Sequence, residues 1–298
     1  MTTVLLIHNP TAGDKEHSGK ELVSLIEAEG FNCIYTTTAD DGWKTIDSAA
    51  DILAVSGGDG TLRQVVMALL GGVTKHRTAP VAFIPSGTAN NLGRSLGLMQ
   101  SPHELVASWK TGDVKGFDVG KIEGCGKGMY FLEGFGFGIF PRLMGSIDRI
   151  KVSADASAEE KVQGALKVLL EITKEYQARE CKIVVDGMTH AGKFLLVEIM
   201  NINAIGPNLD INPSADPGDG EFEIIIIPED QRERLEAFVQ NKIEGLGENV
   251  SFSSLKGKVI SISWDGEDGH ADDEILRTEK GFDISIHMHP CVLSMLLP

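Results

Sequence analysis

Three short segments rich in glycine each follow an apolar run in the first third of the chain. They are NPTAG (9–13), SGGDGT (56–61) and SGTANNLGR (86–94). Glycine allows backbone N–H groups to approach a ligand closely, and the N-terminus of a helix favours an anion. Because the middle segment also opens a helical pattern, it predicts a phosphate-binding turn.

Asp59 and Thr61 add two expectations to this turn. A carboxylate inside a phosphate cradle would repel the phosphates, so Asp59 is expected to face Mg²⁺ or water bound to Mg²⁺. Thr61 stands where the helix is expected to begin, so its hydroxyl could cap that end. The alternative is a tight strand-to-helix turn without a ligand, in which Asp59 is a helix cap.

The elements that carry these segments alternate between strand and helix. The predicted strands are 4–8, 33–37, 52–56 and 80–85, and the predicted helices are 18–29, 61–70 and 103–110. This order predicts a parallel sheet covered by helices. Because ligands bind beyond the carboxyl ends of parallel strands, the three glycine-rich segments are expected to lie along one rim.

After about residue 115 the pattern changes to strands that read as antiparallel. They fall within 117–124, 128–140, 181–201, 221–229, 259–267 and 282–289, with helices at 159–177 and 232–244. The sequence VDGM (185–188) predicts a hairpin turn. We therefore predict an α/β nucleotide-binding domain at 1–115 and a mostly β domain at 116–289. Whether residues 290–298 pack back on the first domain is left open.

Composition excludes several classes of protein. The 298 residues carry a net charge of −16 and no block rich in Lys or Arg, which argues against a nucleic-acid partner and against electrostatic adhesion to an anionic bilayer. No apolar run approaches the roughly 18–20 residues needed to span a bilayer, and the N-terminus lacks the features of a signal peptide. We expect a cytoplasmic protein.

Two common nucleotide-binding motifs are absent. The segment GDKEHSGKE has five residues between Gly13 and Gly19 and a Glu after Lys20, so it does not match a Walker A loop. The segment GFGFG (134–138) lacks the final spacing of a dinucleotide fingerprint.

The combination of VSGGDGT, IPSGTANNLGR and NPTAG resembles the diacylglycerol kinase catalytic domain family. That family includes bacterial soluble lipid kinases and sphingosine and ceramide kinases, and it is more distantly similar to NAD kinases. The resemblance continues through GFDVGK (116–121), PSADPGDGEFEI (213–224) and WDGE (264–267). It implies a Rossmann-like parallel-sheet N-terminal domain and an antiparallel β-sandwich C-terminal domain, with the active site and ATP in the cleft between them.

The resemblance also implies roles for individual residues. Glu267 would be the general base, and Asp118 and Asp59 would be acidic residues of the reacting centre. Asp216 and Asp219 would hold a structural Mg²⁺. The nucleotide would contact Asn9, Gly13, Gly57, Gly58, Asp59, Gly60, Thr61, Gly87, Thr88 and Asn90.

Local alternatives exist for the later motifs. Glu267 lies in WDGEDGHADDE, which by itself reads as an exposed acidic loop, and Asp216 and Asp219 could belong to a plain turn. The segment FLEGFGFGIF (131–140) could line a cleft for acyl chains or be a core strand.

The implied activity is that of an ATP-dependent lipid kinase with ATP and Mg²⁺ as cofactors. It would phosphorylate a hydroxyl of diacylglycerol or a similar lipid alcohol during transient contact with a membrane surface, and an exposed sheet edge would permit a homodimer. Asn91 stands where active members often carry Asp, which removes one carboxylate from the rim. Two alternatives stay open: a kinase of a soluble substrate, as NAD kinases are, and a non-catalytic, regulatory nucleotide-binding protein.

Overall fold

The computed structural model describes residues 1–12, 17–39, 41–45, 50–72, 79–125, 129–146, 153, 156–246, 252–279 and 281–298. The chain divides into two compact units. The first unit is Met1–Phe117 with Cys291–Pro298, and the second unit is Asp118–Pro290.

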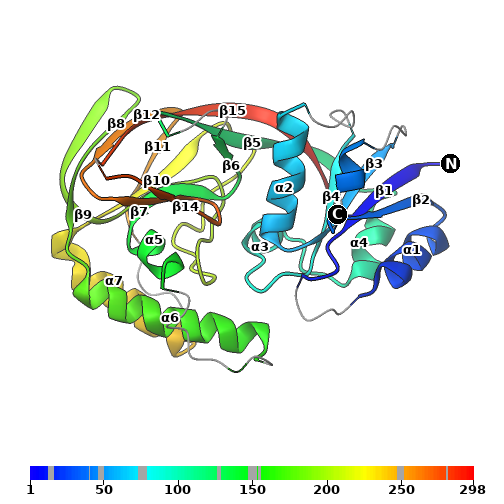
Figure 1. Ribbon diagram of the computed structural model, residues 1–298, viewed down its shortest axis with the longest axis horizontal. Coiled ribbons are helices and arrows are strands. Elements are labelled where there is room, and N and C mark those ends of the chain that lie inside the picture. The colour runs from blue at the N-terminus through cyan, green and yellow to red at the C-terminus, as the bar shows by residue number, and fades with distance from the viewer. Residues whose placement is uncertain are drawn as a thin grey trace. The chain divides into compact units, whose positions relative to one another are not determined.

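The first unit is built on a parallel sheet (Figure 1). Its strands lie in the order β2-β1-β3-β4, and the end of β15 pairs with β4 through Met295 and Val81. Strand β3 is buried along its whole length, as expected for a parallel strand covered on both faces. The strands of the parallel set are β1 (Thr3–His8), β2 (Asn32–Thr37), β3 (Ile52–Gly57) and β4 (Val81–Pro85).

Helices and a short 3-10 turn, η1 (Asp41–Thr45), connect these strands. Two of the helices begin with a capping box, in which a serine side chain and a glutamate three residues later satisfy each other's backbone N–H groups. These are α1 (Gly19–Ala28), after Ser18, and α4 (Pro102–Ser108), after Ser101. The other two, α2 (Asp59–Leu70) and α3 (Asn91–Ser95), have no side-chain cap.

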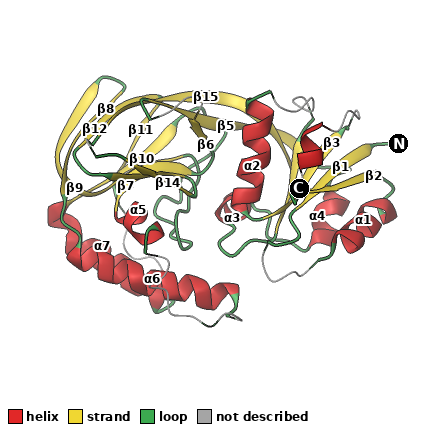
Figure 2. Cartoon of the chain, viewed as in Figure 1, coloured by secondary structure: helices red, strands yellow, loops and turns green. Residues whose placement is uncertain are grey.

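The second unit is an antiparallel β-sandwich, which confirms the predicted fold class (Figure 2). Strand β9 takes part in both layers, because residues 188–194 pair with β8 and residues 194–200 pair with β7 and β10. Two of its strands extend into the first unit, since β5 begins there and β15 ends there. The strands are β5 (Asp113–Glu123), β6 (Met129–Phe131), β7 (Gly134–Gly138), β8 (Arg179–Val185), β9 (Met188–Met200), β10 (Phe222–Pro228), β11 (Ser254–Gly257), β12 (Val259–Trp264), β13 (Asp268–Ala271), β14 (Glu274–Arg277) and β15 (Phe282–Leu297).

Two local predictions can be compared with these strands. The hairpin predicted from VDGM is confirmed, since Asp186 and Gly187 join β8 to β9 with φ values of 45° and 88°. The reading of residues 264–274 as an exposed acidic loop is right for the side chains of Asp265, Glu267 and Glu274 but wrong for the segment as a whole. Residues 268–277 form the hairpin β13–β14, and Asp272 in its turn is buried.

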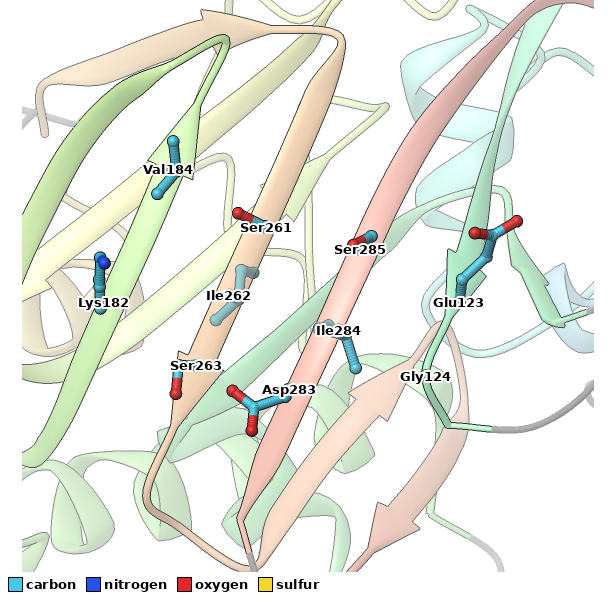
Figure 3. Close-up of a pocket in the computed structure, with 10 residues that line it drawn as sticks. All are labelled: Glu123, Gly124, Lys182, Val184, Ser261, Ile262, Ser263, Asp283, Ile284 and Ser285. Carbon is cyan, nitrogen blue, oxygen red and sulfur yellow. The ribbon is translucent and has the colours of Figure 1, made fainter.

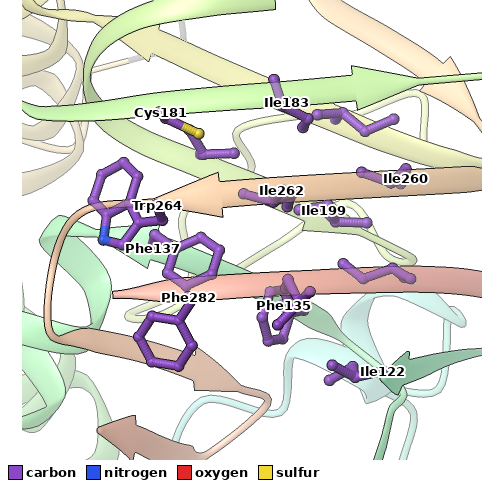
Figure 4. Packing of buried hydrophobic residues seen from close by; sticks show 14 of the residues in the cluster. Ile122, Phe135, Phe137, Cys181, Ile183, Ile199, Ile260, Ile262, Trp264 and Phe282 are labelled. Carbon is purple, nitrogen blue, oxygen red and sulfur yellow. The ribbon is translucent and has the colours of Figure 1, made fainter. Parts of the chain in front are cut away.

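Aromatic side chains fill the core of the sandwich (Figure 4). The Phe137 ring stacks on Trp264 with centroids 5.2 Å apart, and Phe282 lies 5.1 Å from Phe137. Phe131, Phe135 and Phe137 are fully buried. The segment 131–140 is therefore core rather than the lining of an open cleft.

In the described part of the second unit, three helices and a 3-10 turn accompany the strands. Side chains of α5, α6 and α7 form a second apolar cluster with those of β9 and β10, and α6 and α7 lie side by side (Figure 1). The Arg232 guanidinium caps the C-terminus of α6 by donating hydrogen bonds to the carbonyls of Thr173 and Tyr176. These elements are α5 (Ile139–Met144), α6 (Ala158–Glu175), η3 (Glu229–Gln231) and α7 (Arg232–Ile243). Among the helices that the structure describes, none is long and apolar enough to cross a bilayer.

Candidate functional site

The three glycine-rich segments meet at the carboxyl edge of the parallel sheet, as predicted. Asn9 donates from its side-chain amide to the Thr61 hydroxyl at 2.8 Å, which joins the first segment to the second. The Asp59 carboxylate accepts the backbone N–H groups of Asn91 at 2.8 Å and Leu92 at 3.2 Å, which joins the second to the third. The segments therefore form one hydrogen-bonded rim.

Glycine is required where the second and third segments touch. A Cβ atom on Gly87 would lie 2.7 Å from the Cα atom of Gly58 and 2.9 Å from Oδ1 of Asn90. A Cβ atom on Gly58 would lie 3.2 Å from Gly87 Cα. The backbones of the two turns therefore pack directly against each other, which a side chain at either position would prevent.

Asn90 holds the shape of the third segment. It adopts a left-handed conformation with φ 53°, which Asn tolerates better than most residues. Its side chain accepts the Gly87 N–H at 2.7 Å and donates to the Gly87 carbonyl at 2.8 Å. The loop is closed over Thr88, whose side chain is exposed. The structure thus gives Asn90 a positioning role and leaves Thr88 accessible.

Two expectations for the middle segment need revision. Helix α2 begins at Asp59 rather than at Thr61, with Gly58 as its N-cap, and the Thr61 hydroxyl binds Asn9 instead of capping the helix. The Asp59 carboxylate binds backbone N–H groups at the start of α3, which supports the helix-cap alternative for part of its function. Its role toward Mg²⁺ stays a prediction.

The start of α2 has the chemistry of an anion site. The helix has 12 residues and no side-chain hydrogen bond at its N-cap. Gly58, Asp59 and Gly60 at that end are partly or fully exposed. Backbone N–H groups and the helix dipole therefore favour a phosphate group there. Gly13, the other predicted contact from the first segment, lies outside the described residues.

In the second unit, Glu267 lies on a pocket of about 390 Å³. Its side chain is exposed, and the residue directly precedes β13 in the chain. Burial raises the pKa of Tyr176 to about 12, so this phenol is a neutral hydrogen-bond donor. The pocket combines proton acceptors with guanidinium groups. Its charged and aromatic lining residues besides Glu267 are Arg142, Glu175, Tyr176, Arg179 and Asp268.

Asp118 lies in a different environment from Glu267. It is fully buried, accepts the Gly220 N–H at 2.7 Å, and donates its own N–H to the Pro217 carbonyl at 2.6 Å. The structure therefore brings Asp118 to the turn that carries Asp216 and Asp219. Asp118 is not among the described residues that line the Glu267 pocket.

The turn with the predicted metal ligands already contains a cation. Asp216 and Asp219 each accept a backbone N–H two residues later at 3.0 Å. The second oxygen of Asp219 lies 2.9 Å from the Lys256 ammonium, which is also 3.1 Å from Glu223. No group of three or more His, Cys, Asp or Glu side chains in the described ranges could hold a metal ion. The fit to Mg²⁺ is poor here, and the metal role of the two aspartates stays a prediction.

A second pocket of the second unit contains none of the predicted site residues. It encloses about 440 Å³ on the outer face of β8, β12 and β15. Figure 3 shows Lys182, Ser261, Ser263 and Asp283 on these neighbouring strands. This face lacks the predicted base and acids, so it is not part of the candidate site.

Sequence reasoning missed a buried polar network that includes residues of the segment after Glu267. The Asp272 carboxylate accepts the backbone N–H groups of residues 132–134, and the Asn201 amide donates to the carbonyls of Asp118 and Leu132 at 2.9 Å. Glu198 and His270 contact each other within the same unit. Two signals were available: a Glu inside the apolar run FLLVEIM, and glycine at every second position of GFGFG.

Comparisons with known proteins identify the family of each part of the chain. Residues 3–122 match the model of the diacylglycerol kinase catalytic domain, and residues 148–295 match that of the YegS C-terminal NAD kinase beta sandwich-like domain. The diacylglycerol kinase of Staphylococcus carnosus is 26% identical over 275 residues, which cover 87% of this chain and 83% of that protein. The "Probable lipid kinase YegS-like" protein of Pseudomonas aeruginosa is 27% identical over 291 residues, which cover 87% and 90%.

A solved structure shares the fold along the whole chain. The crystal structure of a diacylglycerol kinase from Bacillus anthracis superposes with a TM-score of 0.72 at 23% identity. The match covers 99% of this chain and 97% of the other.

Proposed function

We propose a lipid phosphotransferase activity for this chain, which belongs to the diacylglycerol kinase catalytic domain family. The substrate would be diacylglycerol or a similar lipid alcohol, and the phosphoryl donor would be ATP. The observation that carries this proposal is the convergence of three glycine-rich segments around the uncapped N-terminus of α2.

The donor half of the reaction belongs to the first unit. The backbone at Gly58, Asp59 and Gly60 would bind the phosphates of ATP, because the start of α2 offers N–H groups and a positive dipole end. The Asn9–Thr61 hydrogen bond would keep the first segment against this site. Mg²⁺ bound with the nucleotide would neutralise phosphate charge, and Asp59 is the carboxylate of this rim that could hold it.

The acceptor half belongs to the second unit. Glu267 would accept the proton of the lipid hydroxyl while the hydroxyl oxygen bonds to the γ-phosphorus and the bond to the β–γ bridging oxygen breaks, so that ADP leaves. An exposed carboxylate at the edge of a pocket can reach a substrate proton. Asp118 is fully buried and bound to Gly220, so its proposed role is to position the 216–220 turn.

A second candidate is a kinase of a small polar alcohol. The pocket beside Glu267 is lined by charged and amide side chains, including Arg142, Gln177 and Arg179. Such a lining favours a hydroxylated polar group over an acyl chain. In the lipid kinase proposal, the same pocket would hold the headgroup.

Transfer of labelled phosphate separates these proposals. The protein is incubated with γ-labelled MgATP and a total lipid extract, and the organic and aqueous phases are counted separately. Wild-type protein is compared with Glu267→Gln and with Glu159→Gln, a matched change at an exposed glutamate of α6. Circular dichroism and nucleotide binding verify that each variant is folded.

Organic label that Glu267→Gln abolishes and Glu159→Gln retains would support the lipid kinase and its base. Organic label that survives in Glu267→Gln would remove the base role. Labelled product in the aqueous phase would favour the polar substrate. A folded protein that binds ATP and labels neither phase would contradict both kinase proposals and favour a regulatory nucleotide-binding protein.

A further inference from the structure

Two ionisable side chains are paired in the interior of the second unit. Glu198 on β9 is fully buried and His270 on β13 is 2% exposed. Oε2 of Glu198 lies 3.1 Å from Nε2 of His270, and Nδ1 of His270 lies 3.0 Å from the Asp272 carbonyl oxygen. Because a carbonyl can only accept, Nδ1 carries a proton. The Nε2–Oε2 contact therefore holds one shared proton, either on the imidazole or on the carboxyl group.

The pair joins two strands that are not neighbours. Strand β7 lies between β9 and β13, and Gly136 of β7 is in register with both His270 and Glu198. A Cβ atom on Gly136 would overlap Oε2 of Glu198, and one on Gly134 would lie 2.7 Å from Oε1. The two side chains can meet only because the middle strand has glycine at these positions. This accounts for the first two glycines of GFGFG, whereas a Cβ atom on the third, Gly138, would meet the Leu195 carbonyl.

The strand that the pair holds begins directly after Glu267. Strand β13 has four residues and begins at Asp268, the residue after Glu267. The Phe140 ring of α5 packs edge-on against His270, with centroids 6.4 Å apart. Helix α5 also carries Arg142, which lines the Glu267 pocket. The pair thus contacts the strand that follows Glu267 and the helix that carries Arg142.

Stability alone does not account for this pair. Removing two ionisable groups from water is unfavourable, and well-packed apolar residues at such positions are often as stabilising or more so. Oε1 of Glu198 adds to the cost, since it has no hydrogen-bond partner among the described residues. A buried polar contact can, however, select one register, and a slip of one residue would reverse the faces of β13. We therefore expect the contact to determine the position of β13 rather than to add stability.

We propose that Glu198 and His270 are positioning residues that hold β13 in register and thereby place Glu267 for proton transfer. This inference rests on the proposed function. It assigns neither residue a contact with the substrate.

Replacement of both residues by leucine tests the proposal. We expect Glu198→Leu/His270→Leu to fold with an unfolding midpoint at or above that of the wild type. Its kcat should fall by about tenfold to a hundredfold, because misplacement of a catalytic group by ~1 Å can have an effect of that size. The Kd for MgATP should not change, since the nucleotide residues lie in the first unit.

Two further variants separate positioning from folding. Glu198→Gln keeps a donor facing Nε2 of His270 and should retain kcat to within about threefold, the effect expected when a buried hydrogen bond is preserved. Thr173→Val removes another buried hydrogen bond of this unit, within α6, and should leave kcat unchanged. Gly136→Ala removes the space over β7 without changing either residue of the pair, and it should cause the same loss of kcat. It therefore provides the test if the double variant fails to fold.

Hydrogen exchange makes the test independent of turnover. The backbone N–H groups of 268–271 should exchange faster in the double variant and in Gly136→Ala than in the wild type, while those of β8 and β12 keep their protection. Wild-type kcat together with wild-type exchange in both variants would overturn the positioning role. Faster exchange at 268–271 in a protein whose wild type transfers no phosphate would refute the proposed function but leave the structural part of this inference standing.

Discussion

Gly87 shows how little space the proposed nucleotide site leaves for a side chain. Its Cβ atom would lie 2.7 Å from the Cα atom of Gly58, so Gly87→Ala must separate the SGGDGT and SGTANN turns. We expect the affinity for ATP to fall by at least about tenfold, or ~1.4 kcal/mol. Isothermal titration calorimetry with MgATP measures this. Gly192→Ala is the control, because its Cβ atom would make only an ordinary 3.5 Å contact with Phe194. An unchanged Kd in Gly87→Ala would separate the turn from nucleotide binding.

Lys256 provides a test of the predicted metal site. Its ammonium contacts Asp219 and the buried carboxylate of Glu223, and the hydrogen bond to Asp219 is the largest cause of its raised pKa. We expect the thermal unfolding midpoint of the wild type to be the same in EDTA and in MgCl₂. Lys256→Gln should unfold at a lower temperature in EDTA and recover in MgCl₂, because Mg²⁺ prefers oxygen ligands that the ammonium no longer neutralises.

The matched control for Lys256 is Lys258→Gln, which removes an ammonium 3.9 Å from Glu221 and should show no such recovery. A wild-type protein that loses stability in EDTA would contradict this expectation. It would instead support the Mg²⁺ role that the family resemblance implies for Asp216 and Asp219.

At the scale of elements, the Glu198–His270 contact between β9 and β13 should make stability depend on pH. Burial raises the pKa of Glu198. Burial alone would lower the pKa of His270, but the Glu198 carboxylate, together with Asp272, raises it above its ordinary value. Both groups then bind protons more tightly in the folded state than in the unfolded chain. Their contribution to the free energy of unfolding must therefore decrease as pH rises from about 4.3, the ordinary value for Glu, through the raised pKa of His270.

Urea unfolding at a series of pH values measures this dependence. The wild type should lose stability relative to Glu198→Leu/His270→Leu as pH rises above about 6.5, the ordinary value for His, because the variant lacks both titrating groups. Parallel pH profiles for the two proteins would show that neither group changes its proton affinity on folding.

Local sequence patterns predicted the regular elements well. Strand β3 is an unbroken apolar run, α6 has an apolar stripe with helical spacing, and VDGM places residues of positive φ at the tip of a hairpin. Each of these depends on neighbours within a few residues. The fold class followed from the order of such elements, and the convergence of the glycine-rich segments followed from the geometry of a parallel sheet.

The features that sequence reasoning missed depend on distant partners. The segment after Glu267 is rich in acidic residues, which suggested exposure, yet the Asp272 carboxylate is satisfied by three backbone N–H groups at 132–134. The Thr61 hydroxyl binds Asn9 rather than its own helix. The Glu198–His270 contact needs glycine on a third strand. No local pattern contains these pairings, because folding brings together residues 52 to 140 positions apart.

For the molecule as a whole, charge should govern its contact with membranes. The chain carries a net charge of −16, and none of its described helices could cross a bilayer. A lipid kinase must nevertheless reach its substrate at a surface. We expect co-sedimentation with vesicles of phosphatidylcholine and diacylglycerol to be reduced when phosphatidylglycerol is added, because the protein and the anionic surface repel each other.

Salt identifies the origin of that effect. The screening length is about 30 Å at 0.01 M salt and about 3 Å at 1 M, so the difference between the two kinds of vesicle should disappear as salt is raised. Binding that persists on neutral vesicles at high salt would indicate an apolar contact. Stronger binding to the anionic vesicles at low salt would contradict the prediction. In that case a local group of basic side chains, rather than the net charge, would set the orientation in which the protein meets the lipid.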